Sequence, residues 1–281
     1  MNSPDALAGF STFYLFATAL SVGVTATLPL VPLRQIGKRF FILMTLAAVV
    51  FFALAIASRG VATEHLHLLC VGFLIAFNVV VSEKSCDNYT AARGRWLRFF
   101  SMGCLLAALG FGVAGLIADA LDYPGEILLN GAQPVWISLT YLSSALVLGS
   151  ALVSLVLGHW YLVTRGLSFG VLGRLVALLI VALVVRVVIA ALVGMSQHEH
   201  WSRLWTDAGG PLRFFMSDGL FVGARVLFGM ALPLILALMA RQCVRIRANQ
   251  SATGILYVAV AFVIIGEAIA KHLFLQNGVL V

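Results

Sequence analysis

The chain has 281 residues, of which 62% are hydrophobic and only 10% are charged. Soluble domains are nearer half apolar and a quarter charged, so this composition excludes a soluble domain, a disordered chain and a disulfide scaffold. The formal net charge is +7, which in a soluble protein would suggest nucleic-acid binding. Because this chain is so apolar, the location of the basic residues is more informative than their sum. The composition therefore predicts an integral membrane protein with several spans.

Eight apolar runs, taken in chain order, predict an all-α bundle of eight transmembrane helices in a single membrane domain. Most runs reach the roughly 17–25 residues that a helix needs to cross the hydrocarbon core, and the third run is the shortest. None alternates with a period of two, as the strands of a membrane barrel would. The runs are Phe10–Leu33, Phe40–Ala57, Leu66–Val81, Phe99–Ile117, Val135–Leu157, Leu175–Val193, Gly219–Ala240 and Thr253–Phe274.

The basic residues predict the orientation of this bundle. The loops after the first, third, fifth and seventh runs hold 12 Lys and Arg residues, and the segments on the other side hold three. Because basic loops stay on the cytoplasmic side, both termini are predicted on the outer, periplasmic side of a bacterial inner membrane. The residues before Phe10 lack a basic stretch and include Asp5, so we expect a short external tail and not a cleaved signal peptide.

Two long connections lie on the predicted outer side, at about residues 118–134 and 194–218. Loops of this length usually carry function or bind a partner. The second loop contains Trp201 and Trp205, which also suit a segment resting among lipid headgroups. We expect these loops to contact a peripheral subunit, the membrane lipid, or both.

Two familiar patterns carry no chemistry in this setting. The segment Gly110–Gly115 matches G-x-G-x-x-G, but it lies inside the fourth run with no strand before it, so close helix packing is the preferred interpretation. The cysteines form no C-x-x-C pair that would hold an iron–sulfur cluster or attach a c-type haem, and we expect no metal site. They are Cys70, Cys86, Cys104 and Cys243, of which Cys70 and Cys104 are expected to fill apolar space.

Three ionisable residues fall inside the predicted spans at nearly one depth. With a rise of 1.5 Å per residue, Arg186, Arg225 and Glu267 all lie about 18–21 Å from the inner edge of a core that is about 30 Å thick. Each would cost about 2.5–3.5 kcal/mol if it faced lipid. Opposite charges at equal depth therefore predict an ion pair or a shared polar cavity in the outer third of the bundle.

More titratable groups are predicted close to that depth. Lys271 lies one turn beyond Glu267, His272 follows it, and His65 and His67 begin the third span on the same side. Such a set can bind a polar headgroup and exchange protons with water. The alternative is a purely structural Arg–Glu pair that joins the last three helices, with Lys271 extending outward to the surface.

The fifth run adds a polar stripe and one further histidine. The stripe is expected to face the bundle, where hydrogen bonding between helices explains it; it consists of Thr140, Ser143, Ser150 and Ser154. His159 lies near the inner end of the run, beside Trp160 and Tyr161. It is read either as a histidine satisfied in an aromatic belt or as a haem ligand or proton-uptake group.

The last run carries a resemblance to a known family. Gly266 and Glu267, followed by Lys271 near the end of a final helix, resemble the membrane-anchor superfamily of polysulfide reductase and DMSO reductase (NrfD- and DmsC-like). Chain length, eight spans and the predicted topology are similar over the whole chain. The members of that superfamily are haem-free subunits that interact with quinones and exchange electrons with a peripheral iron–sulfur subunit. The resemblance implies that Glu267 and Lys271 lie near a quinone site.

The leading prediction is therefore a quinone- or quinol-interacting anchor subunit of a respiratory redox complex, not catalytic alone. It would pass electrons between a quinone pool (menaquinone or ubiquinone) and a peripheral iron–sulfur or multihaem subunit on the outer side. Proton transfer is assigned to Glu267, His272 and His67. The quinone headgroup is assigned to Arg186, Arg225, Glu267 and Lys271.

Two alternatives stay open. A b-type cytochrome needs two histidines at one depth on facing helices, and His67 with His272 is the one pair that qualifies. A transporter could use the Arg–Glu cluster as its ion or substrate site. Transporters often have broken helices near the middle of the membrane, and Pro233 interrupts the seventh run.

Overall fold

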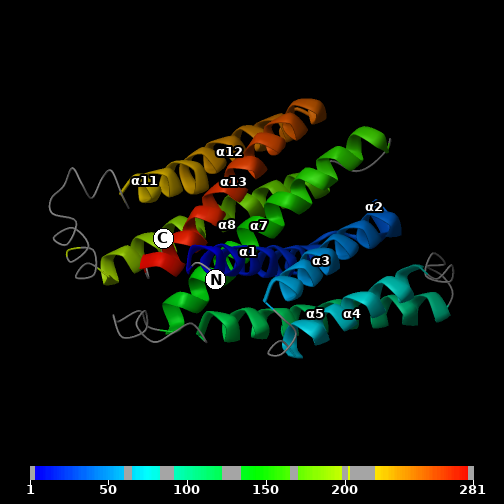
Figure 1. The fold of residues 1–281 in the computed structure, drawn as a ribbon. Helices are drawn as coiled ribbons and strands as arrows, with labels where there is room; N and C mark the ends of the chain where they lie inside the picture. The colour runs from blue at the N-terminus through cyan, green and yellow to red at the C-terminus, as the bar shows by residue number, and fades with distance from the viewer. Residues whose placement is uncertain are drawn as a thin grey trace.

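The computed structural model is a bundle of long helices (Figure 1) and describes residues 4–59, 65–82, 92–121, 134–164, 170–197, 202 and 219–277. Within these ranges it is all-helical, and eight helices are long and apolar enough to cross a membrane. The predicted all-α, multi-pass architecture is therefore confirmed. The elements are α1 (Pro4–Thr27), η1 (Leu28–Leu30), α2 (Leu33–Ile36), α3 (Lys38–Arg59), α4 (His65–Ser82), α5 (Ala92–Leu121), α7 (Pro134–Val163), α8 (Gly170–Ser196), α11 (Leu220–Val226), η5 (Leu227–Ala231), α12 (Leu232–Arg245) and α13 (Asn249–Asn277).

The first span ends earlier than the apolar run predicts. The run continues to Leu33, but α1 ends at Thr27 and a 3-10 turn follows. Pro29 explains this difference, because proline has no N–H to donate and its ring clashes with the carbonyl of the preceding turn. The connection to α3 then passes through Gly37 at φ 88°, a backbone conformation that favours glycine.

Several other helices are longer than their apolar runs. The fourth run was predicted to end at Ile117, yet α5 continues to Leu121. Asp119, which falls in the predicted outer loop, therefore lies in the last turns of α5, where the residue is only 8% exposed. A search for apolar runs stops at the first charged residue, whereas the helix continues because the carboxylate finds partners inside the bundle.

The seventh span is continuous across Pro233, so the predicted interruption is wrong. α11, η5 and α12 form one membrane-spanning helix, Leu220–Arg245, in which Leu227–Ala231 is a π-helical turn. Proline cannot donate to the helical ladder, and a π turn absorbs that defect without breaking the helix. The result is a bulge that begins two residues after Arg225.

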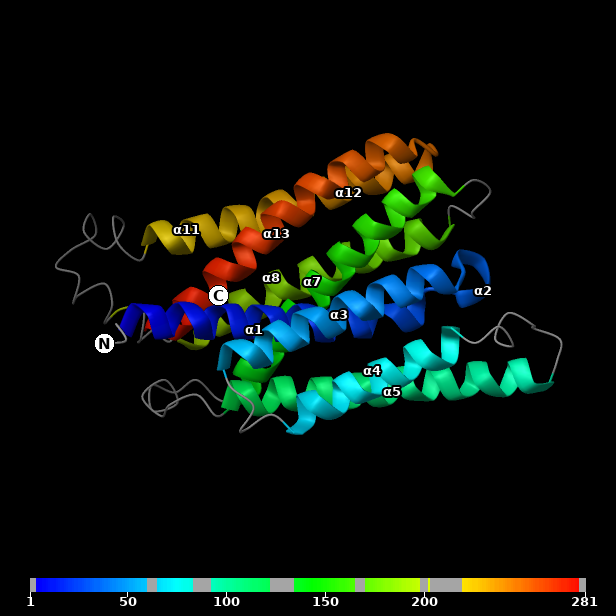
Figure 2. The ribbon, with the colours of Figure 1, turned by 45° about the vertical axis from the view of Figure 1, so that its right-hand side comes forward.

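α1 and α7 form the centre of the bundle. α1 packs against α3, α5, α7 and α13, and α7 packs against α1, α5, α8 and α13. At their crossing a methyl group on either Gly23 or Gly149 would overlap the backbone of the other helix, so only glycine allows this approach. In Figures 1 and 2, α4 and α5 lie on one side of this centre, and α12 and α13 lie on the other.

Successive spans alternate in direction, so both described chain ends lie at the same end of the bundle (Figure 2). We call it the terminus end. Outside the bundle interior, the described basic side chains lie at the opposite end, in the first turns of α3, α5 and α8, in the last turns of α12 and just beyond it. They are Lys38, Arg39, Arg95, Arg98, Arg174, Arg241, Arg245 and Arg247.

Two of the three glycines in Gly110–Gly115 serve helix packing, as predicted, whereas a methyl group on Gly110 would meet nothing within 4 Å. All of them lie inside α5. A methyl group on Gly115 would lie 2.6 Å from the His67 ring, and one on Gly112 would lie 3.2 Å from the Cys70 sulfur. Gly115 therefore leaves the space that the buried imidazole occupies. Cys70 and Cys104 are buried among apolar side chains, in agreement with the sequence interpretation.

Candidate functional site

Glu267 on α13 is the centre of a buried cluster of charges. Its side chain has no exposed surface. Its Oε1 accepts a hydrogen bond from Arg225 Nη2 at 2.9 Å and lies 3.4 Å from Arg186 Nε. The pairing that was predicted from equal depth is therefore confirmed, and the three side chains join α8, α11 and α13.

Lys271 and Ser144 complete the cluster on the other carboxylate oxygen. The Ser144 hydroxyl donates to Glu267 Oε2 at 2.5 Å and accepts from Lys271 Nζ at 2.6 Å. Lys271 Nζ also lies 3.3 Å from Glu267 Oε2 and 5.8 Å from the centre of the Tyr141 ring. Lys271 is 4% exposed, so the structural alternative is wrong in the part that has Lys271 extend outward to the surface.

Three members of the cluster share a depth, on three different helices. Each of α7, α8 and α13 has one tip at the terminus end of the bundle. Ser144, Arg186 and Glu267 each lie ten residues from that tip of their helix. Ten residues correspond to about 15 Å of helix. Each of the three is therefore well inside the bundle, where a charged group needs a partner because water is excluded.

Two facing glycines allow Arg225 to reach Glu267. A methyl group built at Gly266 would overlap the Cα atom of Gly229, and one built at Gly229 would overlap the Arg225 guanidinium. Gly229 belongs to the π turn, and Gly266 immediately precedes Glu267. The two backbones thus approach closely beside the guanidinium of Arg225, which occupies the space that a side chain on Gly229 would need.

Arg186 also ties α8 to the polar stripe on α7. Its Nη1 donates to the Thr140 carbonyl at 3.1 Å and to Ser143 Oγ at 3.4 Å. The four predicted stripe residues are all buried, which confirms that the stripe faces the bundle. The predicted bonding between helices holds for the side chain of Ser143, whereas Thr140 contributes only its backbone carbonyl and Ser150 Oγ donates to the Val147 carbonyl of its own helix.

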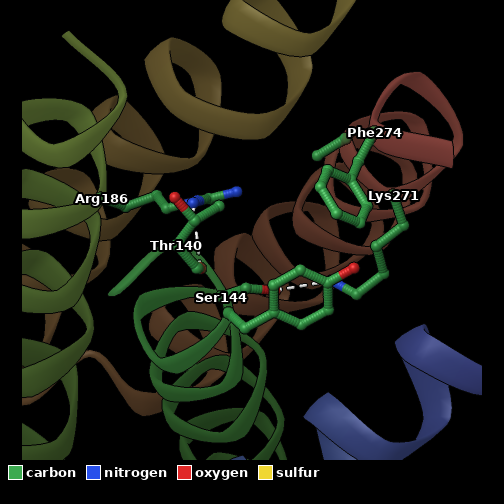
Figure 3. A pocket seen from close by; sticks show the side chains of 7 residues that line it. Thr140, Ser144, Arg186, Lys271 and Phe274 are labelled. Atoms are coloured by element: carbon green, nitrogen blue, oxygen red, sulfur yellow. Dashed lines mark hydrogen bonds between the residues drawn. The ribbon is translucent and has the colours of Figure 1, made fainter. Parts of the chain in front are cut away.

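A cavity opens beside the cluster, between α7, α8 and α13 (Figure 3). It contains about 260 Å³ of empty space when its open mouth is included. The enclosed part has room for about one water molecule. The rings of Tyr141 and Phe274 meet edge-on beside it, with centroids 5.6 Å apart. Its lining is Thr140, Tyr141, Ser144, Arg186, Ala270, Lys271 and Phe274.

The charges are arranged unequally around this cavity. Among the described side chains of the cluster, three cations contact one carboxylate, so these four carry a formal charge of +2 when all are ionised. Arg186 and Lys271 line the cavity, whereas Glu267 and Arg225 are not part of its lining. A ligand in the cavity would therefore meet positive charge and hydroxyl groups, with the carboxylate behind them.

A second buried polar cluster lies nearer the terminus end. Asp119 Oδ2 is 2.7 Å from His67 Nε2 and accepts a hydrogen bond from the Tyr14 hydroxyl at 2.9 Å. The His67 ring also packs against Phe52, with centroids 5.4 Å apart. These contacts join α1, α3, α4 and α5, so His67 belongs to a different cluster from Glu267.

We expect Asp119→Asn to lower the free energy of unfolding by about 1–3 kcal/mol, because the amide replaces an acceptor that is shared by two buried donors. Tyr14→Phe removes one hydrogen bond to the same oxygen and should cost about 1 kcal/mol. Unfolding of the purified chain in mixed micelles, titrated with a denaturing detergent, measures both. If Asp119→Asn proves no more costly than Tyr14→Phe, the carboxylate does not hold this cluster together.

The remaining predicted histidines lie apart from the cavity. His272 is half-buried and packs against the Phe221 ring, with centroids 6.0 Å apart. His65 and His159 are exposed, and His159 Nδ1 lies 3.4 Å from the Tyr257 hydroxyl. A haem held by His67 and His272 would require Asp119 to release His67 Nε2. The hydrogen bond between His67 and Asp119 therefore counts against the haem alternative.

Sequence reasoning missed several residues of both clusters. Ser144 was overlooked beside Ser143, although a Ser-Ser pair inside an apolar run is itself a signal. Tyr141 and Phe274 carry no signal that separates them from ordinary core aromatics. The two loops predicted to contact a partner, about 118–134 and 194–218, lie mostly outside the described residues, as does Cys86.

Comparison with models of protein families, with curated proteins and with solved structures found no match to this chain. Fold and site therefore define the class by themselves. The protein is a multi-pass membrane protein whose described residues form eight spans and hold a buried cluster of three cations and one carboxylate beside a small cavity.

Proposed function

We propose that this chain is the quinone- or quinol-interacting membrane subunit of a respiratory redox complex. In this proposal both termini face the periplasm of a bacterial inner membrane, and a peripheral iron–sulfur or multihaem subunit docks at the terminus end. The observation that carries the proposal is the cavity in which Arg186 and Lys271 meet the aromatic rings of Tyr141 and Phe274.

The donors around the cavity suit a quinone headgroup. The carbonyl oxygens of a quinone accept hydrogen bonds, and Lys271 Nζ and the Arg186 guanidinium are charged donors, which make the stronger hydrogen bonds. Aromatic rings flank flat ligands by offset or edge-on contact. Because the cavity takes about one water molecule, a ring enters it only when Tyr141 and Phe274 separate.

The same side chains provide a path for protons. A bound quinone supplies the two-electron, two-proton chemistry of the reaction. Lys271 Nζ, the Ser144 hydroxyl and Glu267 Oε2 form a continuous hydrogen-bonded chain with links of 2.6 and 2.5 Å. Ser144 can pass a proton between Lys271, at the cavity, and Glu267, behind it. His272, on the turn that carries Lys271, is the proposed link to the surface. A proton relay through His67 would have to pass through the separate cluster that His67 forms with Asp119.

The orientation rests on the charge distribution. The basic side chains at the opposite end of the bundle would face the cytoplasm, because Lys and Arg stay on that side of bacterial membranes. The cluster would then lie in the outer half of the membrane, nearer the periplasm. Electrons would cross only the short distance to a subunit on that face.

We expect Ser144→Ala to lower quinol-dependent turnover of the intact complex by about 100-fold, because the variant removes the hydroxyl that links Lys271 to Glu267 without changing any charge. Ser150→Ala is the matched control, since Ser150 is equally buried on the same helix and bonds only within that helix. It should change turnover less than twofold. Equal turnover in both variants, with the complex assembled, would contradict the proposed proton path.

Purification of the chain from its native membrane tests the function as a whole. We expect quinone and a peripheral redox subunit to accompany it. An α-band in the reduced-minus-oxidised spectrum would instead indicate a b-type cytochrome. A chain that carries neither quinone nor a redox partner, and that takes up an anionic solute into liposomes, would be a transporter.

The transporter is a second candidate because of two observations. The described cluster carries more positive than negative charge, which suits an anionic substrate. In addition, the π turn Leu227–Ala231 lies next to Arg225 in a membrane helix, and π turns are frequent at functional sites. Solute uptake by the chain alone in liposomes separates this function from that of a redox anchor.

A further inference from the structure

The cavity and the charged cluster are arranged as two layers. The layer that lines the cavity contains Arg186 and Lys271, and the layer behind it contains Glu267 and Arg225. Both charged side chains of the cavity lining are therefore cations. Three hydroxyl-bearing side chains also line it, those of Thr140, Tyr141 and Ser144, and the Ser144 hydroxyl donates its proton to Glu267. The electrostatic potential that a ligand meets here is positive.

Such an arrangement is costly without a negative partner. A cation inside the membrane is expensive unless an anion or several hydrogen bonds compensate it, and Glu267 is already shared by three cations. Lys271 lines the cavity. Its ammonium lies 2.6 Å from the Ser144 hydroxyl and 3.3 Å from the Glu267 carboxylate. An ionised oxygen in the cavity would complete the coordination of that ammonium.

We propose that the cavity binds its ligand in an anionic form: a flat aromatic or quinoid ring with an ionised oxygen held by Lys271 and Arg186. The inference rests on the proposed quinone function for the nature of the ring, and on the charges for the ionised oxygen. Arg186 offers a planar fork and Lys271 a compact point charge, so together they can hold one oxygen from two sides. The rings of Tyr141 and Phe274 would flank the ring of the ligand.

Three probes of similar size test this inference on the full chain in lipid nanodiscs. The first is 2-hydroxy-1,4-naphthoquinone, whose ring hydroxyl is ionised at neutral pH. The second is its methyl ether, a neutral quinone of nearly the same shape. The third is a hydroxynaphthoate, an anionic aromatic acid that is not a quinone. Binding is measured by calorimetry, so that the result does not depend on turnover.

We expect the ionised quinone to bind at least about tenfold more tightly than its methyl ether, because two cations face the ionised oxygen. Lys271→Gln should lower the ratio of the two affinities several-fold, because Arg186 is then the remaining cation at the cavity, and Lys271→Arg, which keeps the charge, should retain most of the preference. Ser150→Ala should leave both affinities unchanged. If Lys271→Gln does not fold, the affinities of the three probes for the unmodified chain and for Lys271→Arg still test whether the cavity prefers the ionised ligand.

The outcomes separate this inference from the function on which it rests. Equal affinity for the ionised quinone and its ether would overturn the anionic form and leave quinone binding in place. Binding of the hydroxynaphthoate without either quinone would support an anion site and contradict the quinone function. No binding of any probe would overturn both.

Discussion

Replacing Glu267 with glutamine will lower the free energy of unfolding by about 3–5 kcal/mol, which is the usual cost of removing one partner from a buried ion pair. The variant leaves Arg186, Arg225 and Lys271 facing one another without their shared carboxylate, in a position from which water is excluded. We expect a lower unfolding midpoint in mixed micelles and a smaller yield of folded chain.

Lys271→Gln is the matched comparison, because it removes a charge of the opposite sign from the same cluster. It lowers the formal charge of the described cluster from +2 to +1, so it should cost much less than Glu267→Gln. In the double variant the effects should not add, since the two side chains are in contact. A Glu267→Gln variant within about 0.5 kcal/mol of the unmodified chain would show that the carboxylate does not hold the cations together.

The second large effect is expected at Gly266. Gly266→Ala should lower the free energy of unfolding by about 3 kcal/mol, at the upper end of what overpacking costs, because its methyl group would overlap the Cα atom of Gly229. Backbone cannot move aside as a flexible side chain can. The helices must separate, and Arg225 would then lie farther from Glu267. The unfolding midpoint measures the cost directly.

Gly254→Ala provides the control on the same helix. A methyl group there meets nothing within 4 Å, so the variant should be as stable as the unmodified chain or slightly more stable. A further readout is binding of the ionised naphthoquinone, which should weaken in Gly266→Ala and stay unchanged in Gly254→Ala. Equal stability of the two alanine variants would mean that the close approach of α13 to the π turn is not required.

These experiments also separate a functional cluster from a structural one. If the Arg–Glu cluster only joins helices, Glu267→Gln will be less stable than the unmodified chain. In that case, however, Ser144→Ala will not change turnover and the cavity will not prefer an ionised ligand. The stability of the cluster and its chemistry are therefore tested by different variants, and Ser144 distinguishes them because its substitution changes no charge.

The depth of each charged group along its helix can be predicted from the amino-acid sequence alone. Eight apolar runs, and a constant rise for each residue, were enough to predict the spans and to place Arg186, Arg225 and Glu267 at one depth. Depth follows from counting along a single helix, so no knowledge of neighbouring helices is needed. The confirmed contacts of Glu267 with both arginines are the direct result.

Which groups at similar depth face one another depends on how the helices pack. Rotation about each helix axis and the choice of neighbours depend on packing, and here the glycine contacts between α1 and α7 and between η5 and α13 decide both. That packing turns Ser144 and Lys271 toward Glu267, and it places His67 against Asp119 in a separate cluster. A linear search cannot predict either result, because the residues come from helices that are distant in sequence and meet only when the bundle is assembled.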